Sequence, residues 1–517
     1  MTLPTSASPP DGGAPDRCIP CEELELARVR DERPTQTLPL PVSALEGLPE
    51  GRDSGSLTRR RLLQGGVAGF AAVYGLRALG FEEVFEAAVA QAVPSSQNRL
   101  VVLYLAGGND SLNCVLPGTA APDLAAYRTA RPTIWRRPNV ASAAGAVGSR
   151  DIAGTSGRLA WANPLVSTAG GGDNGSAFGL DTLYGDGGGG PGSDLAFLPA
   201  ADYTPSNFSH FDSSDYWFAG GLASLTTGWL GRWIDRNGSA TNPLQAVSID
   251  TALSKAIRTA VNPVCAIPSV SALGFTMNAG SYGMPPGAPS TANINTEMRE
   301  LAAVTASADN TYLRRSRSTY GLAVDVAGSG ATISGLANAT EAYPTGGSAQ
   351  TLSTKLQLTA KLLAAGLGTR IVTVHWGGFD THGTQVATQD PQLRAVSAAL
   401  GAFKADLTAR GIEQNVTTLV FSEFGRRAGE NGSLGTDHGA GGLMLLSGSA
   451  VRGGWAGEFP GCAPANLVGG NLQVTTDFRS VYQAVLSEWL GGDTTGVLPD
   501  GTPAPIVRAG GGSTLFK

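Results

Sequence analysis

The 517-residue chain has few charged side chains and no surplus of positive charge. Asp, Glu, Lys and Arg make up only 15% of the residues, and 42 acidic against 36 basic side chains give a net charge of −6. Ordinary soluble domains are about 25% charged. Because nucleic-acid binding requires a surplus of Lys and Arg to contact phosphates, this composition argues against a nucleic-acid-binding protein.

Signals of two common enzyme classes are also missing. The sequence contains no Gly-x-Ser-x-Gly segment, which marks the nucleophile of many serine esterases. The loop Gly107-Gly108-Asn109-Asp110 fits neither common pattern of a glycine-rich phosphate-binding loop, so it does not indicate nucleotide binding. Histidine is scarce as well. The four histidines are His210, His375, His382 and His438.

Cysteine is equally scarce, whereas glycine is abundant. Cys18 and Cys21 lie in an N-terminal segment that we expect to be removed. In an oxidising compartment one disulfide is possible among the remaining cysteines, and Cys265–Cys462 is the preferred pair, although spacing does not determine connectivity. Of the 71 glycines, many fall in residues 168–194, where we expect a surface excursion or an insertion loop.

The N-terminal part of the chain predicts export. Residues 1–57 are rich in Pro, Gly and charge and are expected to be disordered. Residues 58–92 begin with three consecutive arginines before a weakly apolar stretch, which is typical of a twin-arginine signal. Glycines and Arg77 interrupt this stretch, so no stable membrane span is expected after cleavage. The predicted location is periplasmic or extracellular; the alternative is an ordinary amphipathic helix.

Residues 93–517 are predicted to form a single α/β domain. Apolar runs without alternation indicate buried strands, and apolar residues at helical spacing indicate helices. The predicted strands are 100–105, 370–375, 417–421 and 443–446, and the predicted helices are 296–326, 351–366, 388–410 and 477–490. This alternation of strands and helices predicts a layered fold with a mainly parallel sheet.

Acidic and histidine side chains follow the predicted strands directly. Asp110 follows the first strand, Asp380 and His382 the second, and Glu423 the third. Ligand sites of open α/β sheets gather at the carboxyl ends of strands. Because residues two apart in an extended chain share a face, Asp380 and His382 can hold one cation together. The alternatives are a turn capped by Asp110 and an ion pair between Glu423 and a nearby arginine.

The remaining histidines divide into two kinds. His438 stands in a glycine-rich loop before the last strand and has no packing reason to be there, which favours a ligand. His375 lies inside a strand, where a core or supporting role is expected. Near His210, a hydroxyl beside the carboxylates is a candidate nucleophile activated by a metal. The alternative there is a polar loop before a helix that starts near Ser213 or Ser214.

Six short motifs stand in the order found in a bacterial domain-of-unknown-function family, which this chain resembles over about residues 60 to 490. The motifs are Gly107-Gly108-Asn109-Asp110, Ser209-His210-Phe211, Gly228-Trp229-Leu230-Gly231-Arg232, Phe379-Asp380-Thr381-His382, Ser422-Glu423-Phe424-Gly425-Arg426 and Thr436-Asp437-His438-Gly439. Members of that family carry twin-arginine signals and are grouped with the alkaline phosphatase and sulfatase superfamily.

The resemblance implies an alkaline-phosphatase-like, doubly wound sheet with helices on both faces, two divalent metals and a hydroxyl nucleophile. Asp110, the nucleophile and Glu423 would hold one metal, and Asp380, His382 and His438 the other. Ser209 would be the nucleophile by position, with Ser111 and Ser213 as alternatives, and Arg426 would bind the anionic substrate.

The chain also departs from the superfamily pattern. Asp380 and His382 are separated by one residue instead of three, and Phe424 stands where a histidine ligand is usual. Asp437 is the possible substitute for that histidine. An oxygen-rich site of this kind would favour magnesium, calcium or manganese over zinc.

The predicted function is an exported metal-dependent hydrolase of phosphate or sulfate esters, acting on a small anionic ester or an envelope component. The alternatives are an exported binding or envelope-structural protein that keeps the fold without catalysis, and a serine esterase that uses Ser209. The resemblance further implies a second exported protein as a possible partner.

Overall fold

The computed structural model describes residues 97–138, 148–185, 194–269, 342–501, 503–508 and 511–517, together with short parts of 300–340. The predicted leader (1–57) and export signal (58–92) lie outside these residues, as does nearly all of the predicted helix over 296–326.

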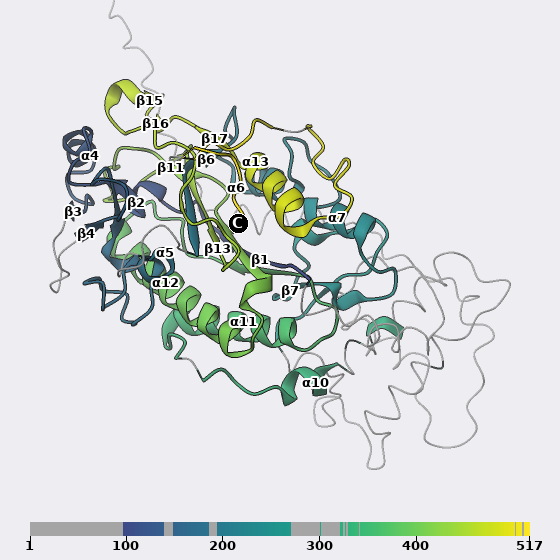
Figure 1. Ribbon diagram of the computed structural model, residues 1–517. Coiled ribbons are helices and arrows are strands. Elements are labelled where there is room, and N and C mark those ends of the chain that lie inside the picture. The colour runs from purple at the N-terminus through teal and green to yellow at the C-terminus, as the bar shows by residue number, and fades with distance from the viewer. Residues whose placement is uncertain are drawn as a thin grey trace, which may run out of the picture. The chain divides into compact units, whose positions relative to one another are not determined.

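A nine-stranded, mainly parallel sheet forms the centre of the domain (Figure 1). Its middle consists of three neighbouring parallel strands, which are β10 (Val416–Phe421), β1 (Arg99–Leu105) and β9 (Ile371–Trp376). Beyond β9 the sheet continues in parallel with β7 (Ala246–Ser248) and β8 (Cys265–Ala266). Beyond β10 it continues with antiparallel β13 (Gly442–Ser447) and then β6 (Leu195–Asp202), which carries the short strands β14 (Gly454–Trp455) and β17 (Thr476–Asp477).

Both faces of the sheet are covered, as strand β1 shows. All seven of its residues are buried. Val101, Leu103 and Leu105 belong to one apolar cluster, whereas Leu100, Val102 and Tyr104 belong to a second cluster. Since alternate residues of a strand point to opposite faces, the sheet lies between two cores. The predicted α/β class with a mainly parallel sheet is therefore confirmed.

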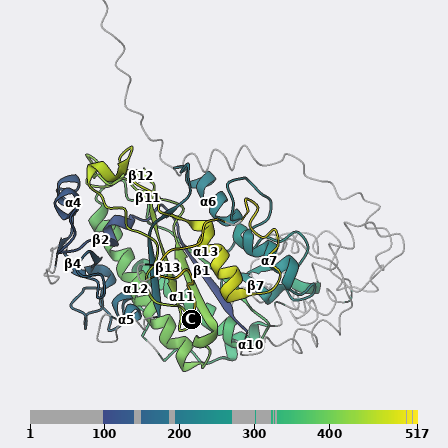
Figure 2. The same cartoon turned by 45° about the horizontal axis from the view of Figure 1, so that its top comes forward.

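Helices from different parts of the chain build the two outer layers (Figures 1 and 2). On the face of Val101, Leu103 and Leu105, the sheet packs against α5 (Leu180–Tyr184), α11 (Gly347–Ala364) and α12 (Gln385–Ala409). On the opposite face, the sheet packs against α6 (His210–Ala219), α7 (Trp229–Asn237) and α13 (Phe478–Ala484). Helix α13 continues as a π-helical turn, η9 (Val485–Leu490).

Smaller elements surround the main sheet. A second, four-stranded sheet has the order β2 (Val115–Pro117), β5 (Leu159–Ala162), β4 (Gly148–Asp151) and β3 (Arg137–Pro138). Two-stranded ladders join β11 (Gly425–Arg426) to β12 (His438–Gly439) and β15 (Leu467–Val468) to β16 (Asn471–Leu472). The short helices are α4 (Leu124–Ala130) and α10 (Gly330–Gly335). No helix in the described part of the chain has the length and apolar character needed to cross a membrane.

Two sequence expectations differ from the structure. The glycine-rich segment 168–194 contains the helix α5, whose residues Leu180 and Leu183 are buried in the core, so its described part is more than a surface excursion. The preferred disulfide between Cys265 and Cys462 is wrong, because both are buried free thiols. Cys265 packs in the sheet on β8, whereas the Cys462 amide donates to Asp123 (2.6 Å).

His375 on β9 is a core residue, as expected. Its ring stacks on Phe218 with centroids 5.3 Å apart, and its Nε2 lies 3.0 Å from the Ser254 hydroxyl. Burial lowers the pKa of His375 to about 4. The folded protein therefore keeps this imidazole neutral at a pH where the unfolded chain protonates it.

This depressed pKa predicts a pH-dependent stability. The contribution of His375 is fully present above the unfolded pKa near 6.5 and is lost as the pH falls towards 4. Between pH 7.5 and pH 4.5, the free energy of unfolding of the wild type should fall by about 2 kcal/mol more than that of His375→Gln. Urea unfolding at the two pH values measures this difference, and equal losses would contradict the assignment.

Candidate functional site

A cluster of histidines and carboxylates lies at the edge of the sheet where β1, β9 and β10 end. Its members are His210, His382, His438, Asp380, Glu423 and Asp437. Asp380 lies beyond the end of β9, and Glu423 lies beyond the end of β10. His210 is the first residue of α6, and His438 lies on β12. Of the five predicted metal ligands, the structure brings Asp380, His382, Glu423 and His438 together at this edge.

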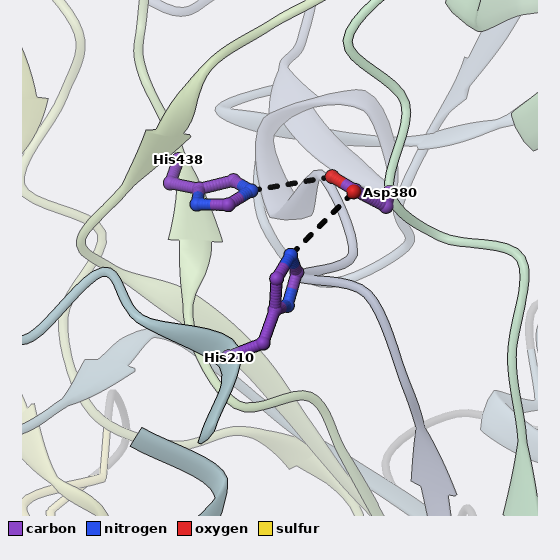
Figure 3. A group of neighbouring side chains, drawn as sticks. All are labelled: His210, Asp380 and His438. Carbon is purple, nitrogen blue, oxygen red and sulfur yellow. Dashed lines mark hydrogen bonds and ion pairs between the residues drawn. The ribbon is translucent and has the colours of Figure 1, made fainter. Parts of the chain in front are cut away.

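Asp380 is the centre of the cluster. Its Oδ1 lies 3.1 Å from Nε2 of His382 and 3.2 Å from Nε2 of His438. Its Oδ2 lies 3.5 Å from Nε2 of His210, and Figure 3 shows the His210 and His438 rings directed at this carboxylate. The two nitrogens of His382 and His438 are themselves only 2.9 Å apart. Such a pair of nitrogens is stable only with a proton or a cation between them.

The outer nitrogen of each ring faces an oxygen atom. Nδ1 of His210 lies 2.7 Å from Glu423 Oε1, and Nδ1 of His438 lies 2.8 Å from the Phe208 carbonyl oxygen. Nδ1 of His382 lies 3.4 Å from Asp437 Oδ1. Because these oxygens can only accept, we assign a proton to each Nδ1. In neutral rings all three Nε2 lone pairs would then point towards Asp380, which is how metal-binding histidines are usually held.

Glycines allow the supporting loops to come this close. Gly107, after β1, has a φ of +121°, and a side-chain carbon there would lie 2.4 Å from the Asp380 amide nitrogen. At Gly435 such a carbon would lie 2.3 Å from the backbone of His382. A larger residue at either position would push apart the loops that carry Asp380, His382 and His438.

The charges of the cluster stabilise one another. Burial alone would raise the pKa of Asp380, but the neighbouring side chains of His210, His382, His438 and Arg426 hold it well below its usual range. Burial alone would lower the pKa of His210, yet Asp380 and Glu423 raise it to about 9. Burial keeps the pKa of His438 below its usual value. The cluster therefore combines an ionised Asp380 with both charged and neutral imidazoles.

Arg426 is buried and contacts the cluster through Asp380. Its side chain is fully buried and donates to Asp380 Oδ1 at 2.7 Å. Its other donors are taken by the carbonyl oxygens of Gly107, Gly108, Phe379 and Thr436. The expected role in binding an anionic substrate is not supported by this geometry, because every nitrogen of the guanidinium is already used.

Asp110 does not join the cluster either. It is completely buried and forms a two-point ion pair with Arg131, at 2.6 and 3.0 Å. The negative charge of Asp110, the expected metal ligand, is thus compensated by Arg131, which directly follows α4. Glu423 is nearby but supports the site indirectly, because its Oε1 accepts from Nδ1 of His210 and from the Gly107 amide (2.8 Å).

The three candidate nucleophiles all have structural hydrogen bonds. Ser209 is the N-cap of α6 and accepts from the Asp212 amide at 3.3 Å. The Ser111 hydroxyl donates to the Gly441 carbonyl at 2.7 Å. The Ser213 hydroxyl donates to the Glu423 carbonyl and accepts from Tyr203. None of the hydrogen bonds described for these three hydroxyls joins them to Asp380.

His210 is the site residue that the sequence analysis did not assign. Its neighbour Ser209 was singled out in the same motif, whereas the imidazole reaches the cluster. A usable signal was present, because His210 is one of only four histidines and is surrounded by hydroxyl and carboxylate residues.

The burial of Asp110 generates a stability prediction. Replacing it with Asn removes the charge that compensates the buried Arg131, so Asp110→Asn should lower the free energy of unfolding by about 3–5 kcal/mol. The control Asp437→Asn alters an exposed carboxylate and should change it by about 1 kcal/mol or less. Chemical denaturation measures both, and equal small effects would show that the Asp110–Arg131 pair does not form.

Comparison with known proteins adds a family but no activity. Residues 288–482 match the sequence profile of a family described as "Protein of unknown function (DUF1501)", and this segment holds Asp380, His382, Glu423, Arg426 and His438. Asp110 and His210 precede it. No curated protein and no solved structure matches the chain. Over residues 288–482 the chain is therefore similar to a family of proteins of unknown function, as its motifs predicted.

Proposed function

We propose that this chain is a metal-dependent hydrolase of phosphate or sulfate esters. In this proposal His210, His382, His438 and Asp380 hold one divalent cation. The observation that carries it is the convergence of three Nε2 atoms on one carboxylate, with each Nδ1 facing an oxygen. His210, Asp380 and His438 each offer one possible ligand atom, and these three atoms lie within 4.8 Å of one another.

The donor set favours one transition-metal ion over two hard cations. Three imidazole nitrogens and one carboxylate suit zinc or a similar ion, whereas magnesium and calcium prefer oxygen ligands. Asp110, which the second metal would need, is engaged by Arg131. We therefore propose a single zinc-like centre instead of the two-metal, oxygen-rich site expected from the resemblance.

The chain's own groups would keep this centre in place. Arg426 fixes the orientation of Asp380 from below, and Glu423 fixes the ring of His210. A bound divalent cation would act as a Lewis acid towards water or an ester oxygen. Because Ser111, Ser209 and Ser213 are held by other hydrogen bonds, the attacking group in this proposal is a water molecule.

Two exposed aromatic residues lie close to His210 in the sequence and suggest the kind of ester. Phe208 and Phe211, on either side of His210, are 39% and 37% exposed. Such surfaces can bind an apolar group of a ligand. We therefore propose esters with an aryl or other apolar group. The acid part, phosphate or sulfate, rests on the resemblance to the alkaline phosphatase and sulfatase superfamily, as does the proposed alkaline-phosphatase-like form of the fold.

Export belongs to the same proposal and is supported by the arginines before the apolar stretch of residues 58–92. The second candidate function is an exported binding or envelope-structural protein, with another exported protein as its partner. This alternative is favoured by the engagement of all three candidate hydroxyls in structural hydrogen bonds.

Metal content and turnover test the proposal together. After loading with zinc or manganese and removal of free ions, the full chain should retain close to one equivalent, measured by elemental mass spectrometry. His382→Ala with His438→Ala removes two ligands and should lower the retained metal roughly tenfold or more. The control His375→Gln alters a histidine outside the cluster and should retain the metal.

The same proteins are then assayed with p-nitrophenyl phosphate and p-nitrophenyl sulfate. Metal-dependent turnover that disappears in the double variant supports the hydrolase. Bound metal without turnover favours the binding or structural protein, and a folded wild type that retains no metal contradicts both the centre and the catalysis.

A further inference from the structure

A buried glutamine connects the two loops that carry His382 and His438. Gln385, the first residue of α12, is completely buried. Its Oε1 accepts from the hydroxyls of Thr381 (3.2 Å) and Thr436 (2.6 Å). Thr381 directly precedes His382, and Thr436 lies two residues before His438. One amide oxygen therefore holds both loops.

The other end of the amide is fixed by the buried ion pair. Nε2 of Gln385 donates to Asp110 Oδ2 and to Oε1 of Gln389 (3.2 Å). Asp110 is in turn held at two points by Arg131. Because an ionised carboxylate can only accept, the amide group must face Asp110 with its nitrogen and the threonines with its oxygen. The orientation of Gln385 is thus determined from both sides.

Backbone contacts connect the same segments. The Thr436 amide donates to the Thr381 carbonyl (3.2 Å), and the Gln385 amide donates to the Leu434 carbonyl (2.9 Å). Thr384 and Leu434 both have a positive φ, 44° and 62°. Residues with side chains adopt this conformation only where surrounding contacts impose it. The junction between the two loops is therefore held in a defined and strained geometry.

We propose that Gln385 is a positioning residue that sets the separation of His382 and His438. It does so by connecting the loops of these two histidines to the buried Asp110–Arg131 ion pair. This inference rests on the proposed metal centre. His382 and His438 have Nε2 atoms 2.9 Å apart, so a small displacement of either loop would change the separation of the two donors. Gln385 contacts neither ring directly, and acts through Thr381 and Thr436.

The helix offers a matched control one turn later. Gln389 is equally buried on α12, but its amide donates to Asn109 Oδ1 (2.9 Å) and the Asp110 carbonyl (3.2 Å). Gln385→Met and Gln389→Met both remove a buried amide of the same network, so both should destabilise the fold. Removal of a group bonded directly to a ligand usually weakens metal affinity about 10- to 100-fold. Because Gln385 acts through Thr381 and Thr436, we expect Gln385→Met to weaken zinc affinity by about 10-fold, at the lower end of this range, and Gln389→Met to leave it close to wild type.

A second variant tests the route of this effect. Thr436→Val removes the hydroxyl that donates to Gln385 and should weaken zinc binding in the same direction. Combined with Gln385→Met it should add little, because both changes break one connection. Equal losses of affinity in Gln385→Met and Gln389→Met, or full additivity of Thr436→Val with Gln385→Met, would overturn the proposal.

The four histidines allow a test that does not require metal. In metal-free full chain, the ring Cε1–Hε1 resonances of His382 and His438 should move in Gln385→Met and stay in place in Gln389→Met, while His375 serves as the internal reference. Unchanged resonances in Gln385→Met would overturn the positioning role. A wild type that binds no zinc would instead contradict the proposed function, so the two failures are distinguishable.

Discussion

The contact between Arg426 and Asp380 is the interaction on which the rest of the site depends. A buried guanidinium must have all of its donors satisfied. Each of the three nitrogens of the Arg426 guanidinium donates to a carbonyl oxygen, in segments that follow β1 and β9 or precede β12. Arg426 thereby ties together the loops that carry the cluster. Its remaining bond orients Asp380, around which the imidazoles of His210, His382 and His438 gather.

The Arg131–Asp110 pair and the Arg426–Asp380 pair have opposite consequences for their carboxylates. The Arg131–Asp110 pair excludes solvent from both partners, so its carboxylate has no capacity left for a ligand. In the Arg426–Asp380 pair the arginine is buried while the aspartate side chain remains 33% exposed, so its carboxylate still meets three imidazoles. Exposure therefore separates the structural carboxylate from the candidate functional one. Gln385 joins the two, since it contacts Asp110 and the threonines beside the histidines.

The local sequence pattern was sufficient to predict the strands that carry the site and some of the residues in it. Continuous apolar runs predicted β1, β9, β10 and β13, and their carboxyl ends indicated Asp380, His382 and Glu423. Strand β6 was not predicted, because alanines and a proline interrupt its apolar residues. The ion pair of Asp110 was not predicted, because its partner Arg131 follows α4 and lies outside every motif. The role of Gln385 depends on contacts up to 275 residues apart, which no local spacing encodes.

X-ray absorption spectroscopy of the zinc-loaded protein tests the proposed metal centre. We expect about three imidazole nitrogens at roughly 2.0–2.1 Å and one carboxylate oxygen, with one imidazole fewer in His210→Gln. His210 is decisive, because it joins the cluster from outside the segment that matches the family. A shell of oxygen ligands alone, or a spectrum unchanged by His210→Gln, would contradict a centre built from these three histidines and Asp380.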